Sequence, residues 1–189
     1  MEQNNKNIWV WVVVGVIVVA VVVYLALTGG FSTMKPSEQE VQQQGEFSET
    51  TGVSPISEEG VVLNTQGEEA RNDVQPGAPE APQQSNPITD DSQVPASAIK
   101  VSVSAEGFSP SSFTVRAGAP VTVSVTATDT QTHVFAFKDS SLQAVAVGVG
   151  PGETRAITFN APSSSGEYTF FCNVPGHEAR GEVGTMIVE

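Results

Sequence analysis

Hydrophobic and polar residues alternate along residues 97–189. Ile99, Val101 and Val103 alternate with polar residues, and the same period of two recurs in later runs. This period is typical of half-buried β-strands. It predicts about eight short strands, near 99–103, 113–116, 121–125, 134–137, 144–147, 156–159, 168–171 and 183–188. Gly, Pro, Asp and Ser clusters separate the runs and no helical stripe competes with them, which predicts an all-β antiparallel sandwich over 97–189.

A different pattern opens the chain. After a short tail at residues 1–7, the 20 residues from Ile8 to Leu27 carry no charge, and as a helix they would span roughly 30 Å, the thickness of a bilayer core. The alternative is a cleaved signal peptide, but those have a shorter apolar run and a small-residue cleavage site. We therefore expect a transmembrane helix over 8–28, with the short N-terminus inside and the rest of the chain outside the cytoplasm.

Residues 29–96 between these two parts are rich in Glu, Gln, Ser, Pro and Gly and poor in aromatic residues. Such a composition buries too little apolar surface to offset its ordering entropy. The apolar spots at Phe47 and at 61–63 stand too far apart to build a core. The sequence therefore predicts a disordered acidic linker over 29–96.

Charge narrows the classes of partner. The chain has 8 basic and 21 acidic residues and a net charge of -13. Residues 97–189 hold five of the basic and eight of the acidic residues, a net of -3, so the excess lies in the N-terminal half. Binding to nucleic acid needs clustered Lys and Arg, so nucleic acid is not an expected partner.

The whole chain contains one cysteine and two histidines, and all three fall in the predicted sandwich. His133 stands at the start of a predicted strand, Cys172 at the end of another, and His177 follows Cys172 with four residues between them. Each alone has an ordinary structural interpretation as a cap, a loop residue or core packing. Together they match the Cys-x4-His loop plus upstream His that binds copper through a trigonal His2Cys set.

These residues lie in segments that resemble the cupredoxin, or blue copper, family. The most specific is the ligand loop at 171–177, FCNVPGH, and the segments 107–118 and 151–154 are also similar. The resemblance covers roughly 99–189. It implies a Greek-key cupredoxin β-sandwich that holds one copper ion, cycling between Cu(I) and Cu(II), with His133, Cys172 and His177 as strong ligands.

The sequence departs from the family at the weak axial ligand. Where the family usually has Met, this chain has Glu182. Met186 lies four residues further along a strand, or about 13 Å at about 3.3 Å per residue, and we expect it in the core. Glu182 either ligates copper or turns to solvent and leaves the axial position empty or filled by a backbone carbonyl. We favour ligation, which makes His133, Cys172, His177 and Glu182 the predicted metal ligands.

A second departure is Val134. The family often has Asn after the first ligand histidine, where its side chain ties the two ligand segments together. Val134 cannot form that hydrogen bond, so the groups around the ligands must differ here, and such groups tune both rigidity and potential.

The predicted function is one-electron transfer by a membrane-anchored, extracytoplasmic, mononuclear copper protein, with redox proteins at the membrane as partners. The alternative is a copper carrier, buffer or sensor that uses the same ligands. An interaction module that has lost its metal fits less well, because the ligand set is retained. We do not expect an enzyme, because a binuclear centre needs a second loop cysteine and multicopper enzymes need further histidines, and the chain has neither.

Overall fold

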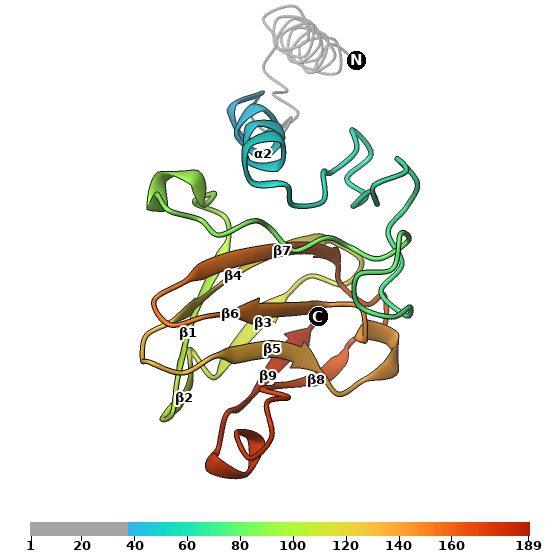
Figure 1. Ribbon diagram of the computed structural model, residues 1–189. Coiled ribbons are helices and arrows are strands. Elements are labelled where there is room, and N and C mark those ends of the chain that lie inside the picture. Colours follow the sequence, from blue (N-terminus) through green and yellow to red (C-terminus); the bar gives the residue numbers. More distant parts are fainter. Residues whose placement is uncertain (1–37) are drawn as a thin grey trace, which may run out of the picture. The chain divides into compact units, whose positions relative to one another are not determined.

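Nine strands form two sheets that face each other in a computed structural model, which describes residues 38–189 (Figure 1). The four-stranded sheet has the order β2-β1-β4-β7, and the five-stranded sheet has the order β3-β9-β8-β5-β6. The strands are β1 (Ile99–Ser104), β2 (Gly107–Ser109), β3 (Ser112–Val115), β4 (Pro120–Ala127), β5 (His133–Phe137), β6 (Ala146–Val149), β7 (Thr154–Asn160), β8 (Gly166–Phe171) and β9 (Val183–Val188). The helical elements are α2 (Glu38–Thr51) and the short 3-10 turns η1 (Asp91–Gln93), η2 (Ser140–Leu142) and η3 (Glu178–Arg180). The all-β sandwich is confirmed.

Two strand pairs differ from the purely antiparallel prediction. β1 pairs with β4 in parallel, and β3 pairs with β9 in parallel, whereas the remaining strand pairs are antiparallel. Alternation along one strand reports which side chains are buried and carries no information on the direction of its neighbour. The additional strand, β2, has only three residues, too few for a period of two to be recognised.

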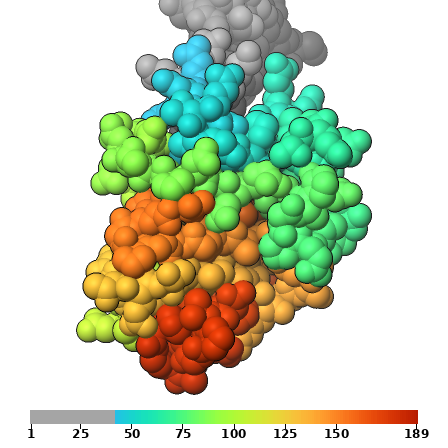
Figure 2. Space-filling model, viewed as in Figure 1, coloured from blue at the N-terminus to red at the C-terminus, as the bar shows by residue number. Residues whose placement is uncertain are grey.

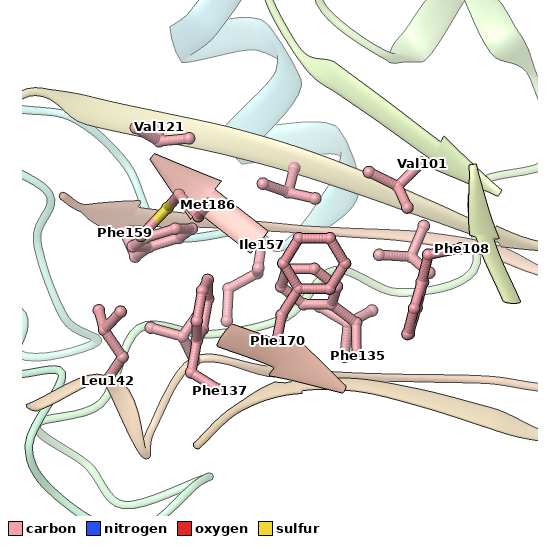
Figure 3. Close-up of a cluster of buried hydrophobic side chains, with 14 of the residues drawn as sticks. Val101, Phe108, Val121, Phe135, Phe137, Leu142, Ile157, Phe159, Phe170 and Met186 are labelled. Atoms are coloured by element: carbon pink, nitrogen blue, oxygen red, sulfur yellow. The ribbon is translucent and has the colours of Figure 1, made fainter. Parts of the chain in front are cut away.

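The core between the sheets is built around Phe170 of β8. Its ring is stacked on Phe113 at a centroid distance of 5.4 Å, and it packs against Phe135 at 4.9 Å and edge-on to Phe108 at 5.2 Å. Figure 3 shows Phe170 with Phe108 and Phe135 among aliphatic side chains of the same core. Met186 is fully buried in the same cluster, as expected, and is therefore a packing residue.

Gly184 of β9 leaves room for that central ring. Phe170 pairs directly with Gly184, and a Cβ atom at position 184 would lie 2.2 Å from Cζ of Phe170 and 2.6 Å from the carbonyl oxygen of Ser111. We expect Gly184→Ala to lower the free energy of unfolding by about 1–3 kcal/mol, because the core must shift to admit one methyl group. Urea unfolding measures it. Gly148→Ala in β6 is the control, because nothing lies within 4 Å of the added Cβ; equal losses in both variants would contradict the steric explanation.

Residues 52–96, called the strap below, are folded onto the sandwich, so the prediction of a disordered linker is wrong for this segment. The backbone N–H of Ser85 donates to the carbonyl of Ala156 at 2.7 Å, and that of Ile88 donates to the carbonyl of Thr154 at 2.8 Å. The strap thus runs along β7, the edge of the four-stranded sheet. Figure 2 shows it, in teal and green, covering one side of the sandwich.

The strap is ordered because its few apolar residues pack together with α2 and with the edge of the sandwich. Val53, Ile88 and Val94 form a buried cluster with Phe47 of α2 and Ala156 of β7. Elsewhere in the strap, Val62 is fully buried. The composition argument considered only a core that the segment could build alone, and it therefore missed a core shared with β7.

The predicted transmembrane helix over 8–28 and the first part of the predicted linker lie outside the described residues. Within residues 38–189, no helix is long and apolar enough to cross a membrane.

Candidate metal centre

Four side chains that can bind a metal meet where β5 begins and β8 ends. His133 is the first residue of β5, and Cys172 follows the last residue of β8. His177 precedes η3, and Glu182 lies between η3 and β9. The connection from β8 to β9, red in Figure 1, therefore supplies three of the four groups, and the start of β5 supplies the fourth.

The four groups form one tight cluster. One ligand atom from each residue lies within 4.8 Å of the other three. Oε2 of Glu182 is 2.8 Å from Nδ1 of His133 and 2.9 Å from Nδ1 of His177, and Sγ of Cys172 is 3.4 Å from Nδ1 of His177. All four predicted site residues are thus brought together, although His133 is separated from the others by more than thirty residues of chain.

The cluster is closed to solvent. His133, Cys172 and Glu182 are fully buried, and His177 is 7% exposed. Glu182 therefore does not turn to solvent, which was the alternative left open by the sequence. Its backbone is fixed on both sides, because its N–H donates to the carbonyl of His177 at 3.3 Å and its carbonyl accepts from the N–H of Cys172 at 3.0 Å.

Neighbouring groups orient the ligands. Nε2 of His133 lies 3.0 Å from Oδ1 of Asp129, which leaves Nδ1 facing the cluster. The backbone N–H of Val134 donates to Sγ of Cys172 at 3.3 Å. Val134 therefore contributes a hydrogen bond to the site from its main chain, although its side chain cannot form one. A carboxylate behind a ligand histidine fixes the tautomer and the ring orientation.

The environment sets the protonation of the acidic groups. Burial raises the pKa of the Cys172 thiol, and this outweighs the opposing hydrogen bonds from the backbone N–H groups of Val134 and Val174. Burial alone would raise the pKa of Glu182 too, but hydrogen bonds from His133, Arg180 and other members of the cluster leave it lowered. The backbone N–H of Gln131, followed by His133, lowers the pKa of Asp129 to about 2. The metal-free cluster thus contains a neutral thiol and an ionised Glu182.

Metal affinity should therefore rise with pH. Because the pKa of the Cys172 thiol is raised, the metal-free protein keeps this proton near neutral pH and must release it when the thiolate binds. Glu182, whose pKa is lowered, is already ionised near neutral pH and adds no pH dependence to the metal affinity in that range. Between about pH 7 and pH 8.5 we expect about tenfold tighter binding per pH unit, measured by Zn(II) competition titration. An affinity that does not change with pH would show that the thiol is already ionised.

The donor set suits a transition metal. A thiolate is a soft ligand, imidazole is intermediate, and a carboxylate is hard. One buried thiol, two imidazoles and one buried carboxylate together exclude a calcium or magnesium site, which takes oxygen ligands only. The residues present therefore fit a copper ion, and zinc would compete for the same donors.

Comparison with known proteins identifies the family. The family model described as a cupredoxin-like domain matches residues 82–188, more than half of the chain. The chain belongs to the cupredoxin family. The matched region of this cupredoxin begins within the strap, so the family domain includes residues that run along β7 as well as the nine strands. A search of curated protein sequences finds no match.

Several solved structures are similar to this cupredoxin. A dithionite-reduced auracyanin from the photosynthetic bacterium Roseiflexus castenholzii is 27% identical, with 50% of this chain and 98% of that chain covered and a TM-score of 0.42. Auracyanin A, a "blue" copper protein from the green thermophilic photosynthetic bacterium Chloroflexus aurantiacus, is 22% identical, with 49% and 98% covered and a TM-score of 0.40. Amicyanin from Paracoccus versutus is 23% identical, with 55% and 92% covered and a TM-score of 0.41.

The sequence did not reveal Asp129 and Arg180 as part of the site. Asp129 approaches His133 from a turn, and Arg180 donates through Nη2 to Oε1 of Glu182 at 2.7 Å. The one sequence feature that links them to the site is their spacing from the predicted ligands. Asp129 stands four residues before His133, and Arg180 stands two residues before Glu182. Such spacings are common for charged residues in loops, so they become informative only when the fold is known.

Proposed function

We propose that this cupredoxin is a one-electron carrier with a single copper ion bound by His133, Cys172, His177 and Glu182. The observation that supports this most strongly is the buried cluster of four ligand atoms within 4.8 Å of one another. When bound, copper supplies the Cu(I)/Cu(II) couple. The chain's contribution is to hold one thiol, two imidazoles and one carboxylate in place before the metal arrives, so that a change of oxidation state demands little rearrangement of the ligands.

Burial favours electron transfer over the alternative of a copper carrier or buffer. A carrier must pass its ion to a partner's ligands, and here three ligands are inaccessible and the fourth, His177, is only 7% exposed. His177 is the one residue of the four with any solvent exposure, so its imidazole edge offers a route to the surface that suits an electron better than an ion. A sensor that exchanges copper with its surroundings would also require the buried site to open.

An enzymatic role for the chain alone is disfavoured. Catalytic metal sites keep one position open for substrate or water. In this cluster, Oε2 of Glu182 lies within 3 Å of Nδ1 of both histidines and offers a fourth ligand, and both of the chain's histidines are already used. The protein could still deliver electrons to an oxidase or reductase.

We also propose that the protein is held at a membrane by a helix over 8–28, with the cupredoxin domain on the extracytoplasmic side. The support is the run of 20 uncharged residues from Ile8 to Leu27. Anchoring raises the effective concentration of the domain near redox proteins in the same membrane. Those proteins are the proposed partners.

The test is to add one equivalent of Cu(II) to the full-length protein in detergent and to record visible and EPR spectra. An intense thiolate-to-copper band is expected, and it should be lost in the Cys172→Ser variant. A colourless ion in the wild-type protein would refute the copper site. Electron transfer is then separated from copper exchange by two rates: reduction and reoxidation should be fast and reversible, whereas transfer of copper to an added chelator should be slow.

A further inference from the structure

A closed ring of hydrogen bonds runs through the cluster of four side chains and out to the surface. Its inner part joins Asp129 to His133 at 3.0 Å and His133 to Oε2 of Glu182 at 2.8 Å. Its outer part runs from Oε1 of Glu182 to Nη2 of Arg180 at 2.7 Å, and from Nη1 of Arg180 to Oε1 of Gln131 at 3.1 Å. The backbone N–H of Gln131 donates to Oδ1 of Asp129 at 2.8 Å and closes the ring.

The two oxygens of Glu182 have separate partners in this ring. Oε1 accepts from Arg180, whereas Oε2 faces His133 and His177. The Arg180 side chain is 41% exposed and the Glu182 side chain is fully buried, so the guanidinium spans the distance between solvent and the cluster. Arginine suits this place, because its planar group carries several donors in fixed directions and can bind two acceptors at once.

The ring also connects the two segments that supply the ligands. Gln131 and Asp129 lie in the loop before β5, whereas Arg180 is the last residue of η3 and Glu182 lies between η3 and β9. Val134, at the position where the family often ties these segments through an Asn side chain, provides only its backbone N–H to Cys172. The side-chain connection is made at Arg180 instead.

We propose that Arg180 is a positioning residue for the copper site: it holds Oε1 of Glu182, presents only Oε2 to the metal, and clamps the two ligand segments together through Gln131. This inference rests on the proposed copper site. Arg180 also places a positive charge next to the buried carboxylate, and a positive charge near the metal favours Cu(I) over Cu(II). Removal of this charge should therefore lower the reduction potential.

Arg180→Met is the decisive variant, because methionine keeps much of the length of the side chain and removes both its charge and its donors. We expect a changed Cu(II) EPR spectrum and an equilibrium shifted on the order of tenfold toward Cu(II), which is about 59 mV for one electron. Arg180→Lys keeps the charge and a donor for Glu182 but lacks the two separate nitrogens through which Arg180 binds Glu182 and Gln131 together, so it should recover most of the potential. Gln131→Leu should produce a smaller change in the EPR spectrum.

Lys138→Met is the matched control. Lys138 forms a salt bridge with Glu178 of the same η3 turn, and both side chains are about half exposed. The variant therefore removes a cation that pairs with η3 but contacts none of the four ligands. Its spectrum and potential should match those of the wild-type protein.

The outcomes separate this inference from the copper proposal. An unchanged spectrum and potential in Arg180→Met, or identical shifts in Arg180→Met and Arg180→Lys, would overturn the role of Arg180. If Arg180→Met does not fold, an unchanged EPR spectrum in Gln131→Leu would overturn it. The metal-free protein gives an independent readout: NMR should show slowly exchanging guanidinium protons for Arg180, and their absence would contradict the ring. A wild-type protein that fails to bind Cu(II) but retains these signals would refute only the copper site.

Discussion

Replacement of Glu182 by methionine should raise the reduction potential of the bound copper. Oε2 of Glu182 lies within 3 Å of both imidazoles that would ligate the ion. A hard anionic oxygen favours Cu(II), whereas a soft thioether favours Cu(I). The variant replaces the carboxylate with a thioether and leaves the positive charge of Arg180 without its partner. Both effects favour Cu(I). We expect a shift toward Cu(I) of at least about tenfold, or about 59 mV, measured by a spectroelectrochemical titration.

A control for this experiment is Glu178→Met. It removes the same charge from the neighbouring η3 turn, but Glu178 is half exposed and pairs with Lys138, away from the cluster. Its potential should remain close to that of the wild-type protein. Similar shifts in both variants would attribute the effect to general charge, and an unchanged potential in Glu182→Met would refute Glu182 as a ligand. Glu182→Gln, which keeps the shape of the side chain, should give an intermediate result.

Removal of the strap should destabilise the sandwich. Residues 41–189 form one compact unit, and a chain that begins at residue 97 would lose Val53, Val62, Ile88 and Val94, all of them buried. Each buried aliphatic side chain contributes about 1.5–3 kcal/mol, and the exposure of Ala156 adds to the loss. We therefore expect residues 97–189 to unfold at a much lower urea concentration than residues 41–189, with a loss of several kcal/mol.

A chain of residues 82–189 makes the comparison graded. It keeps the backbone bonds of Ser85 and Ile88 to β7 but loses α2 and Val62. Its unfolding midpoint should fall between those of the other two chains. Equal midpoints for residues 41–189 and 97–189 would mean that the strap adds no net stability and that its order depends entirely on the sandwich.

The ligand cluster could be predicted from the sequence because its chemistry is concentrated in rare residues. The chain has one cysteine and two histidines, and all three are used. Glu182 was predicted because it stands five residues after His177 in the sequence, where the family usually has the axial ligand. The partners of these ligands were not predictable in this way, since Asp129 and Gln131 act from a turn whose path depends on the pairing of β5.

The fold was predictable to the extent that burial alternates along the chain. Alternation identified most strands and correctly placed Met186 in the core. It misplaced the strand predicted at 144–147, which the structure gives as Ala146–Val149, because a continuous apolar run contains no phase information. The strap was missed for a related reason: Val62 is fully buried and its backbone N–H donates to Oδ1 of Asn160, a residue far away in sequence on which local composition carries no information.

The strap has a consequence for how neighbouring molecules meet. An uncovered edge strand offers a row of free N–H and C=O groups to any other strand, and this is a common route to aggregation. At one edge of the four-stranded sheet, β2 has only three residues and offers little to pair with. At the other edge, the seven-residue β7 is long enough to do so, and the strap bonds to its backbone there. If the proposed anchor concentrates the protein on a membrane surface, this covering would keep adjacent copies from pairing with each other through β7.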